Sequence, residues 1–411
     1  MEREFDIVVY GASGFVGRQA ACYLGARAAS AGLRIAIAGR DRAKLEAVRA
    51  ESGAGIADVL CADAHDREAI DAIAARTRVV LTTAGPFATH GNALVDACVR
   101  FRTHYVDITG ESPWMRDLID RHHERAVAEG TRIVPACGFD CVPSDIGAFL
   151  VARFFRDVLD VPCGDVRAYF ELSGGLNGGT AASMLALAET PGQMARMREP
   201  FLLDPADTHD AAERARNRDP RSVRFDPIPA AWTGPFLMGP VNTRVVRRSA
   251  ALFASWGEAY GPAFTYQEYM RFGGTQARLK ALAVTTVLGL FEAAVQRRST
   301  RTIIARLAPK PGAGPSEATI RRARFRCELV GMDARGPQVR VVIADRGDPS
   351  NAVTVKCVCE SALALAIDLE RLPGGPERGG VLTPATAFGD VLVERLRAAG
   401  MHLSAPTAVQ N

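Results

Sequence analysis

Three glycines near the start of the chain have the spacing of a phosphate-binding turn. Gly11, Gly14 and Gly17 follow the apolar run at 7–10 and precede residues with helical apolar spacing. A strand, a glycine turn and a helix in that order direct backbone N–H groups and a positive helix end at a pyrophosphate. Gly11 permits the tight turn, Gly14 lets phosphate approach, and Gly17 allows close helix–strand contact. A purely structural turn is the alternative, but the flanking elements favour nucleotide binding.

A basic residue at the end of the next strand indicates which dinucleotide binds. Arg40 follows the expected strand at 33–38, where an acid usually holds the ribose hydroxyls of NAD. A guanidinium can instead grip a 2′-phosphate through two hydrogen bonds, and Lys44 lies close behind. We therefore predict NADPH/NADP as the cofactor. The alternative is that Arg40 is a solvated strand-end residue and Asp41 caps the following helix.

The elements that must position these residues alternate as strand and helix through the first third of the chain. Strands are expected at 7–10, 33–38, 56–62, 78–83, 104–108 and 132–136. Helices are expected at about 41–51, 66–76, 91–102 and 113–129. This pattern predicts an α/β fold with a Rossmann-like, doubly wound parallel sheet, whose ligands bind beyond the carboxyl ends of the strands.

The pattern changes after about residue 145. A helix at 145–155, a strand at 165–172 and two alternating strands at 320–329 and 337–345 predict an inserted α+β second domain. We interpret 204–235 as a long surface excursion and 308–316 as a loop. Helices at 353–371 and 384–399 close the chain. The predicted domains are therefore 1–144 (NADP binding), 145–352 (substrate or partner) and 353–411 (helices packing back on the first domain).

Composition narrows the class of protein. The 411 residues are 48% hydrophobic and 23% charged, with a formal net charge of +4, which is too mild to imply a nucleic-acid partner. The nine cysteines form no C-x-x-C pair and no metal-ligand spacing, so we expect small buried hydrophobes and no metal. The first residues lack a basic-then-apolar secretion signal, so we expect a cytoplasmic protein.

One apolar run has two interpretations. Residues 281–291 carry no charge and are too short to cross a bilayer, and four arginines follow between 297 and 306. The run is either a buried helix with a solvated basic end, or an apolar surface for lipid, acyl chain or partner. The second interpretation implies peripheral membrane contact through 281–306.

Eight stretches carry a resemblance that covers almost the whole chain. They are Tyr10–Gly17, Ala38–Arg40, Thr83–Phe87, Tyr105–Glu111, Gly138–Asp145, Gly178–Thr180, Lys310–Ser316 and Gly379–Pro384. Through them the chain resembles the saccharopine dehydrogenase-like oxidoreductases, and within these the trans-acting enoyl reductase branch. Two positions depart from that pattern: Cys141 stands where serine is expected, and Ser350-Asn351 stand where a glycine and an aromatic residue are usual.

The resemblance implies an NADPH-dependent oxidoreductase that reduces the α,β double bond of a carrier-bound or lipid acyl chain. An acyl carrier protein or a lipid-linked acyl substrate is then the expected partner, and the sequence leaves a homodimer open. Two alternatives remain. One is a saccharopine-type reductase acting on amino-acid and keto-acid substrates, and the other is a non-catalytic protein that binds NADP and lipid.

Candidate catalytic side chains come from strand ends, because no tyrosine is followed by lysine four residues later. Tyr105 and Asp107 share a face of the fifth strand. Tyr105 is a candidate proton donor or enolate stabiliser, and Asp107, like Glu111, a candidate ribose ligand. His90 follows Gly85-Pro86-Phe87 and is expected at the nicotinamide edge. Each also has a structural alternative: a packed tyrosine, loop-ordering carboxylates and a helix-start histidine.

Other roles follow from position in the expected sheet. The cofactor-binding residues are Gly11, Ser13, Gly14, Phe15, Val16 and Gly17 for the pyrophosphate, Arg40 and Lys44 for the 2′-phosphate, Asp63 for the adenine, and Ala84, Gly85 and Pro86 for the nicotinamide ribose. The glycine cluster at 173–180 offers donors for an oxyanion or a phosphate. Cys137 and Cys141 are expected to pack, and Asp140 and Asp145 to cap the helix after Pro143.

Overall fold

The first of two β-sheets collects the alternating strands of the amino-terminal third. The structure, a computed structural model, describes residues 3–173, 178–205, 209–307, 315–333 and 338–409. Its first sheet is entirely parallel, in the order β13-β6-β5-β4-β1-β2-β3. The strands are β1 (Phe5–Tyr10), β2 (Ile35–Gly39), β3 (Ile56–Cys61), β4 (Thr77–Thr82), β5 (His104–Asp107), β6 (Arg132–Val134) and β13 (Gly380–Val381).

Helices cover both faces of this sheet because its buried strands present an apolar side chain in each direction. Ile7 and Val9 of β1 pack on one face, whereas Val8 packs on the other. The first face is covered by α1 (Phe15–Ala31), α2 (Arg42–Glu51) and α15 (Thr354–Ile367). The second face is covered by α3 (Arg67–Arg76), α5 (Asn92–Phe101) and α6 (Ser112–Ala128). The predicted doubly wound sheet is confirmed.

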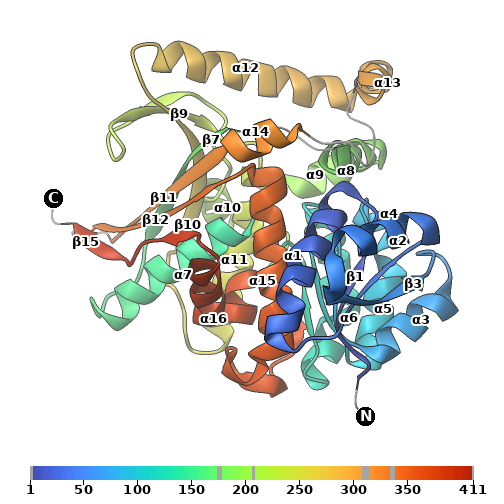
Figure 1. The fold of residues 1–411 in the computed structure, drawn as a ribbon. Helices are drawn as coiled ribbons and strands as arrows, with labels where there is room; N and C mark the ends of the chain where they lie inside the picture. Colours follow the sequence, from blue (N-terminus) through green and yellow to red (C-terminus); the bar gives the residue numbers. More distant parts are fainter. Residues whose placement is uncertain (1–2, 174–177, 206–208, 308–314, 334–337, 410–411) are drawn as a thin grey trace.

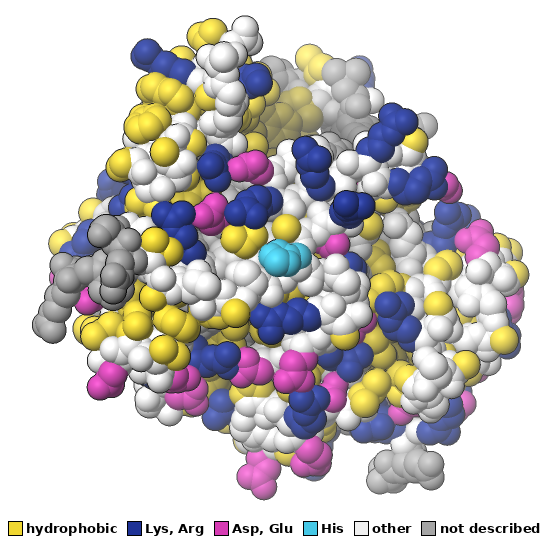
Figure 2. All heavy atoms as spheres, turned by 60° about the vertical axis from the view of Figure 1, so that its left-hand side comes forward, with side chains coloured by type: hydrophobic (Ala, Val, Ile, Leu, Met, Phe, Trp, Pro, Cys, Tyr) yellow, Lys and Arg dark blue, Asp and Glu magenta, His cyan; other side chains and the backbone are white. Residues whose placement is uncertain are grey.

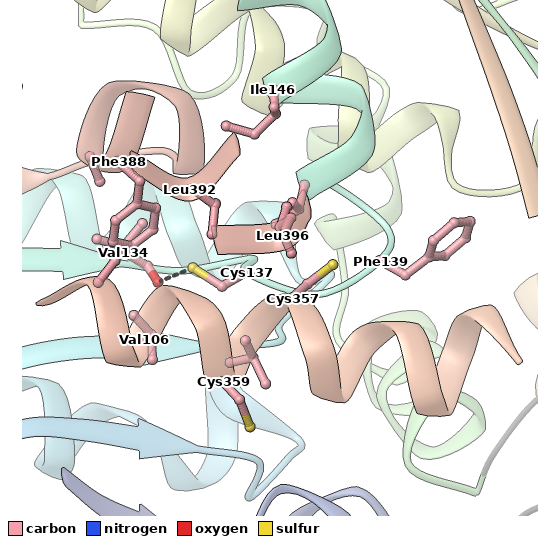
Figure 3. Packing of buried hydrophobic residues seen from close by; sticks show 14 of the residues in the cluster. Val106, Val134, Cys137, Phe139, Ile146, Cys357, Cys359, Phe388, Leu392 and Leu396 are labelled. Carbon is pink, nitrogen blue, oxygen red and sulfur yellow. Dashed lines mark hydrogen bonds between the residues drawn. The ribbon is translucent and has the colours of Figure 1, made fainter. Parts of the chain in front are cut away.

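Helix α15 lies between the two sheets (Figure 1), and the hydrophobic core around it contains several cysteines. Cys357 of α15 lies near Cys137, whose thiol donates to the carbonyl oxygen of Val134 at 3.3 Å (Figure 3). Cys359 points to the other side of α15, toward the carbonyl oxygen of Ala20. Burial raises the pKa of all three thiols. Leu392 and Leu396 of α16 (Pro384–Ala398) belong to the same core. These cysteines are buried and unreactive, as expected from the sequence.

The second sheet is mixed and follows the order β14-β12-β11-β7-β10-β9-β8, with β15 also on β12. Its members are β7 (Asp165–Ser173), β8 (Arg224–Asp226), β9 (Ala231–Pro235), β10 (Thr265–Phe272), β11 (Arg324–Met332), β12 (Gln338–Arg346), β14 (His402–Leu403) and β15 (Thr407–Val409). The antiparallel β11–β12 pair confirms the two alternating strands, and its connection at 334–337 lies outside the described residues. The three domain boundaries stay predictions.

The interpretation of 204–235 as a surface excursion is wrong for its second half. Strands β8 and β9 lie there and extend the second sheet. The hydroxyl of Tyr169 on β7 donates to the buried carboxylate of Asp226 at 3.0 Å. Proline and arginine made the segment look like a loop, but strands this short leave almost no periodic signal. Helix α10 (Ala211–Arg216) lies in the first half of this segment, and α9 (Gln193–Met197) precedes the segment.

Three buried arginines of α11 (Gly239–Ser255) hold the segment 199–204 by its backbone. Arg244 donates to the carbonyl oxygen of Glu199 at 3.1 Å, and Arg247 to that of Pro200 at 2.8 Å. Arg248 donates to the carbonyl oxygens of Leu203 and Val381, each at 2.6 Å. The last contact ties α11 to the edge strand of the first sheet. Guanidinium groups with several donors suit this task.

A buried carboxyl group joins the second sheet to the helices between the sheets. Glu268 of β10 accepts hydrogen bonds from Ser144 of α7 (Val142–Asp157) at 2.5 Å and from Tyr266 at 2.8 Å. Its second oxygen accepts from the amide of Asn242 on α11 at 2.9 Å. Burial outweighs these bonds and raises the pKa of Glu268 from 4.5 to about 8.

Because of this carboxyl group, the folded state should become less stable as pH rises. The unfolded chain releases the proton near 4.5, whereas the folded chain holds it until about 8, so the folded state binds more protons in between. We expect the free energy of unfolding to fall with pH over that window, by at most about 1.4 kcal/mol per pH unit from this group. In Glu268→Gln this slope should become shallower in urea titrations, because the contribution of Glu268 is removed, while exposed Glu317→Gln should keep the wild-type slope. Equal slopes in all three proteins would contradict the assignment.

The apolar run at 281–291 is not buried, so that interpretation is wrong. It forms most of α12 (Ala277–Gln296), which lies with α13 (Arg298–Leu307) at the top of Figure 1. Two described helices are long and apolar enough to cross a membrane, but the window in α15 is 78% buried and the one in α12 only 11%. Helix α15 is thus a core helix, and α12 is a surface helix.

Candidate cofactor and active site

The glycine turn after β1 leaves backbone donors at the mouth of α1. Gly11 has φ +83°, and its carbonyl oxygen accepts from the N–H of Gly14 at 3.0 Å. The N–H groups of Gly11 and Ala12 donate to Ala38 on the neighbouring β2. Helix α1 then begins at Phe15, and no side chain of the described residues caps it. The first-turn amides are therefore available to an anion.

The same turn packs against the loop after β4, as a cradle for a dinucleotide requires. A Cβ atom on Gly11 would lie 3.0 Å from the Cβ atom of Ala84. A Cβ atom on Gly17 would lie 2.2 Å from the carbonyl oxygen of Gly11 and 2.7 Å from Oγ1 of Thr83. Both positions therefore require glycine, and the cradle fits a pyrophosphate beside Gly85 and Pro86. Half-buried Phe15 and exposed Ser13 border it, and Val16 is buried below.

At the end of β2, the side chains of Arg40 and Lys44 have different surroundings. Asp41 caps α2 by accepting from the N–H of Lys44 at 3.1 Å, and it pairs with the Lys44 ammonium at 3.3 Å. Arg40 is exposed and makes no ion pair with any residue that the structure describes. The structural interpretation is confirmed, since Asp41 is a cap and Arg40 is a solvated strand-end residue. The exposure of Arg40 is compatible with a 2′-phosphate ligand, and that role stays a prediction.

His90 ends α4 (Phe87–His90), and its N–H donates to the carbonyl oxygen of Pro86 at 3.0 Å. Its ring packs edge-on against His65, with 5.5 Å between centroids. Burial lowers the pKa of His90, with help from His65 and Arg40, while Asp63 acts the other way. One oxygen of Asp63 accepts from the N–H of His65 at 2.9 Å. A role for His90 at the nicotinamide edge stays a prediction.

Tyr105 and Asp107 share a face, as expected, but neither is exposed to the crevice. The Tyr105 hydroxyl donates to Asp107 at 2.8 Å, and both side chains are fully buried. The other oxygen of Asp107 accepts from the N–H groups of Thr109 and Ala136, at 2.9 and 2.8 Å. Burial raises the pKa of Asp107 to about 7 and that of Tyr105 well above its usual value. The pair orders two loops, which is at odds with a proton donor and a ribose ligand.

Glu111 orders the neighbouring loop and holds a helix from the second half of the chain. Its two oxygens accept from the N–H groups of Phe87 and Ala88, at 2.9 and 2.8 Å, at the start of α4 (Phe87–His90). The Ser183 hydroxyl on α8 (Gly178–Glu189) donates to the same carboxylate at 2.8 Å. A Cβ atom on Gly85 would lie 3.6 Å from that hydroxyl oxygen. Helix α8 therefore lies over Gly85, a residue expected at the nicotinamide ribose.

The segment before α15 packs against the loop after β6. A single π-helical turn spans Pro349–Val353, and Thr354 follows it. The Thr354 hydroxyl accepts from the N–H of Phe139 at 3.2 Å and donates to the carbonyl oxygen of Pro349 at 3.0 Å. The departing pair Ser350-Asn351 thus lies in a turn that contacts the loop after β6. Such π-turns often mark functional sites.

The caps expected after Pro143 are not formed, since no side chain caps α7. Asp145 accepts instead from the Ser249 hydroxyl and, at 2.7 Å, from the N–H of Ala385 in the first turn of α16. Cys141 is buried, and its thiol contacts the amide oxygen of Asn242 at 3.5 Å. Both residues therefore join helices rather than face the crevice.

Sequence reasoning missed Ser183 and Thr354, since both reach the site over more than 70 residues of chain. The glycine cluster was the available signal for α8, although its residues 174–177 lie outside the described part of the structure. The loop at 308–314 lies outside it too. Within the described ranges, no three His, Cys, Asp or Glu residues come together in a way that could hold a metal ion.

Known proteins share the amino-terminal domain and almost the whole length of this chain. Residues 7–134 match the family model of the saccharopine dehydrogenase NADP binding domain. Over its full length the chain is 38% identical to a protein of Mycobacterium bovis and 37% identical to one of Mycobacterium leprae, both named trans-acting enoyl reductase. Each alignment covers 97% of both chains. A Mycobacterium tuberculosis protein with the same name, given provisionally, is 40% identical over 98% of this chain and 97% of its own.

Two solved structures share the fold at low sequence identity. Saccharopine dehydrogenase (L-Glu forming) from Saccharomyces cerevisiae superposes with a TM-score of 0.53 and 15% identity, over 98% of this chain and all of that one. Homospermidine synthase from Legionella pneumophila, in complex with NAD, gives 0.50 and 9%, over 100% and 92%. The arrangement of the two sheets is thus that of saccharopine dehydrogenase. The chain carries an NADP-binding domain of that type, and by its full-length similarity it belongs to the trans-acting enoyl reductase family.

Proposed function

We propose that this protein is a cytoplasmic NADPH-dependent enoyl reductase that saturates the α,β double bond of an acyl thioester. Its relatives' name and its NADP-binding domain support the reaction class. Carrier-bound or lipid-linked acyl chains are the proposed substrates, presented by a separate carrier protein or lipid.

The observation that carries this proposal is the character of the helix that covers the crevice. Of the described side chains of α8, that of Ser183 lies near Gly85, and those of residues 184–188 after it are Met, Leu, Ala, Leu and Ala. None is charged, and all are only half-exposed. An uncharged, mostly apolar cover suits an acyl chain, whereas a substrate with several carboxylates needs cations around it. This favours enoyl reduction over a saccharopine-type reaction.

The chain's own residues bind, orient and exclude water. The amides at the mouth of α1 bind the pyrophosphate, and Arg40 binds the 2′-phosphate. Glu111 fixes the loop that borders the nicotinamide ribose and holds α8 over it through Ser183. When bound, the reduced cofactor supplies the hydride. Exclusion of water by α8 would strengthen any hydrogen bond to the developing enolate oxygen.

Oxidation of NADPH with defined substrates tests the reaction. We expect turnover with a crotonyl-pantetheine thioester and formation of the butyryl product, identified by mass spectrometry. No turnover is expected with glutamate or lysine paired with keto acids. Turnover of the amino-acid and keto-acid pairs alone would overturn the proposal in favour of a saccharopine-type enzyme. NADPH binding without oxidation in either set would favour a binding protein.

Removal of the Ser183 hydroxyl should weaken substrate binding more than it weakens cofactor binding. Ser183→Ala loses the hydrogen bond that holds α8 to Glu111, a contribution of about 1 kcal/mol. We expect KM for the acyl thioester to rise about fivefold, with the Kd of NADPH unchanged. Exposed Ser30→Ala on α1 is the matched control. An unchanged KM in Ser183→Ala would show that α8 does not cover the substrate.

A further inference from the structure

We propose that the outward face of α12 is the surface by which this protein lies on an anionic lipid membrane. The outward face is defined by Leu279, Leu282, Val287 and Leu290. The inference is independent of the proposed reaction, since these residues lie outside the cofactor crevice.

The outward face is apolar over almost the whole helix. Leu279, Val287 and Leu290 are each about two-thirds exposed, at 65, 64 and 66%, and Leu282 is 44% exposed. Ile303 on α13 adds a side chain that is 57% exposed. Large apolar side chains gathered in this way on a surface mark a site of interaction.

The inward face fixes α12 along the body of the protein. Ala277, Ala281 and Val295 are buried. A Cβ atom on Gly234 of β9 would lie 2.9 Å from the Thr285 hydroxyl oxygen, so the helix lies tight against this strand. Glu292, the single acidic residue of α12, pairs with Arg198 at 2.7 Å. A helix held sideways in this way can enter a membrane surface with its outer face but cannot cross the bilayer.

Basic residues at the two ends of α12 indicate which partner binds the outward face. Lys280 lies near the start of α12, and Arg297 and Arg298 follow its end. All three are exposed, and none forms an ion pair within the described ranges. Figure 2 shows dark-blue basic side chains beside yellow hydrophobic ones at the top of the molecule. An apolar stripe with basic residues at both ends is typical of helices that lie in an anionic membrane interface.

A second copy of this chain fits less well. Whether two α12 helices met in parallel or antiparallel, basic ends would face basic ends, and like charges would repel across the contact. An acidic carrier protein would complement the ends but would have to bury the uncharged middle of the stripe. Lipid headgroups and acyl chains satisfy both parts at once.

Sedimentation of the full-length protein with vesicles tests the proposal. We expect binding to vesicles of equal parts phosphatidylcholine and phosphatidylglycerol, weaker binding to pure phosphatidylcholine, and a decrease with salt. Leu290→Glu should lower the partition coefficient about tenfold or more, because a charge replaces a leucine inserted in lipid.

Val158→Glu is the matched control, because Val158 is 62% exposed at the end of α7. It should bind vesicles like the wild type, and both variants should keep the wild-type Kd for NADPH, which shows that they are folded. Absence of binding to the anionic vesicles, or equal binding by both variants, would overturn the proposal. So would a dimer in sedimentation velocity that Leu290→Glu dissociates without any vesicle binding.

Discussion

Replacement of Gly17 by alanine should abolish NADPH binding. The added Cβ atom would lie 2.2 Å from the carbonyl oxygen of Gly11 and 2.7 Å from the Thr83 hydroxyl oxygen. The first contact is with backbone, so the turn must move, and the amides at the mouth of α1 lose their alignment. We expect the Kd of NADPH to rise at least about 100-fold and the protein to lose about 3 kcal/mol of stability. Isothermal calorimetry and urea titration measure the two effects.

Two glycine variants keep this prediction testable if Gly17→Ala fails to fold. Gly14→Ala places its Cβ atom 3.2 Å from the Gly11 carbonyl oxygen, so it should fold and bind NADPH more weakly. Gly289→Ala on α12 meets nothing within 4 Å and should leave binding unchanged while slightly favouring the helix. If folded Gly14→Ala and Gly17→Ala both bind NADPH like the wild type, the helix mouth does not hold the pyrophosphate.

Replacement of Arg40 by alanine should remove most of the preference for NADPH over NADH. Arg40 is exposed at the end of β2 and has no ion-pair partner among the described residues. A guanidinium on a phosphate contributes about 1.5–3 kcal/mol. We therefore expect the Kd of NADPH to rise between about tenfold and about 100-fold, with the Kd of NADH unchanged. Titration of the two cofactors by fluorescence measures both values.

Lys44→Ala is the matched control for this experiment. The Lys44 ammonium pairs with Asp41 at 3.3 Å, and the Lys44 backbone rather than its side chain completes the cap of α2. We expect NADPH binding within about twofold of the wild type, as for loss of an exposed ion pair. A larger effect in Lys44→Ala than in Arg40→Ala would assign the 2′-phosphate to the lysine instead.

The local sequence pattern was enough to predict all strands of the first sheet except β13. Strands such as β1 and β4 are continuous apolar runs between turn residues, and every expected strand there lies within two residues of the observed one. The tight glycine turn and the exposed position of Arg40 at the end of β2 were equally predictable, while their cofactor roles stay predictions. Strand β13 was not, because two residues paired at a distant sheet edge leave no periodic signal.

The site residues that sequence reasoning misplaced depend on tertiary contacts. A shared strand face brought Tyr105 and Asp107 together correctly, but the cover that buries them comes from other elements. Ser183, which sequence reasoning missed, contacts Glu111 from the second half of the chain. Helix α12 was misplaced for a related reason. Its apolar sequence suggested burial, but whether another part of the chain covers an apolar helix cannot be read from the helix itself.

The hydrogen bonds from α11 to the backbone of residues 199–204 also affect which substitutions this family should tolerate. A carbonyl oxygen is the same acceptor whichever amino acid carries it, so Arg244 and Arg248 bind atoms that every residue has, whereas Arg247 also lies over the ring of Phe201, 5.6 Å from its centroid. Half-exposed Leu202 packs against the core, so apolar replacements there should cost less stability than polar ones. The guanidinium of Arg248, which serves Leu203 and Val381 together, should tolerate not even lysine, whose single ammonium cannot reproduce a planar fork.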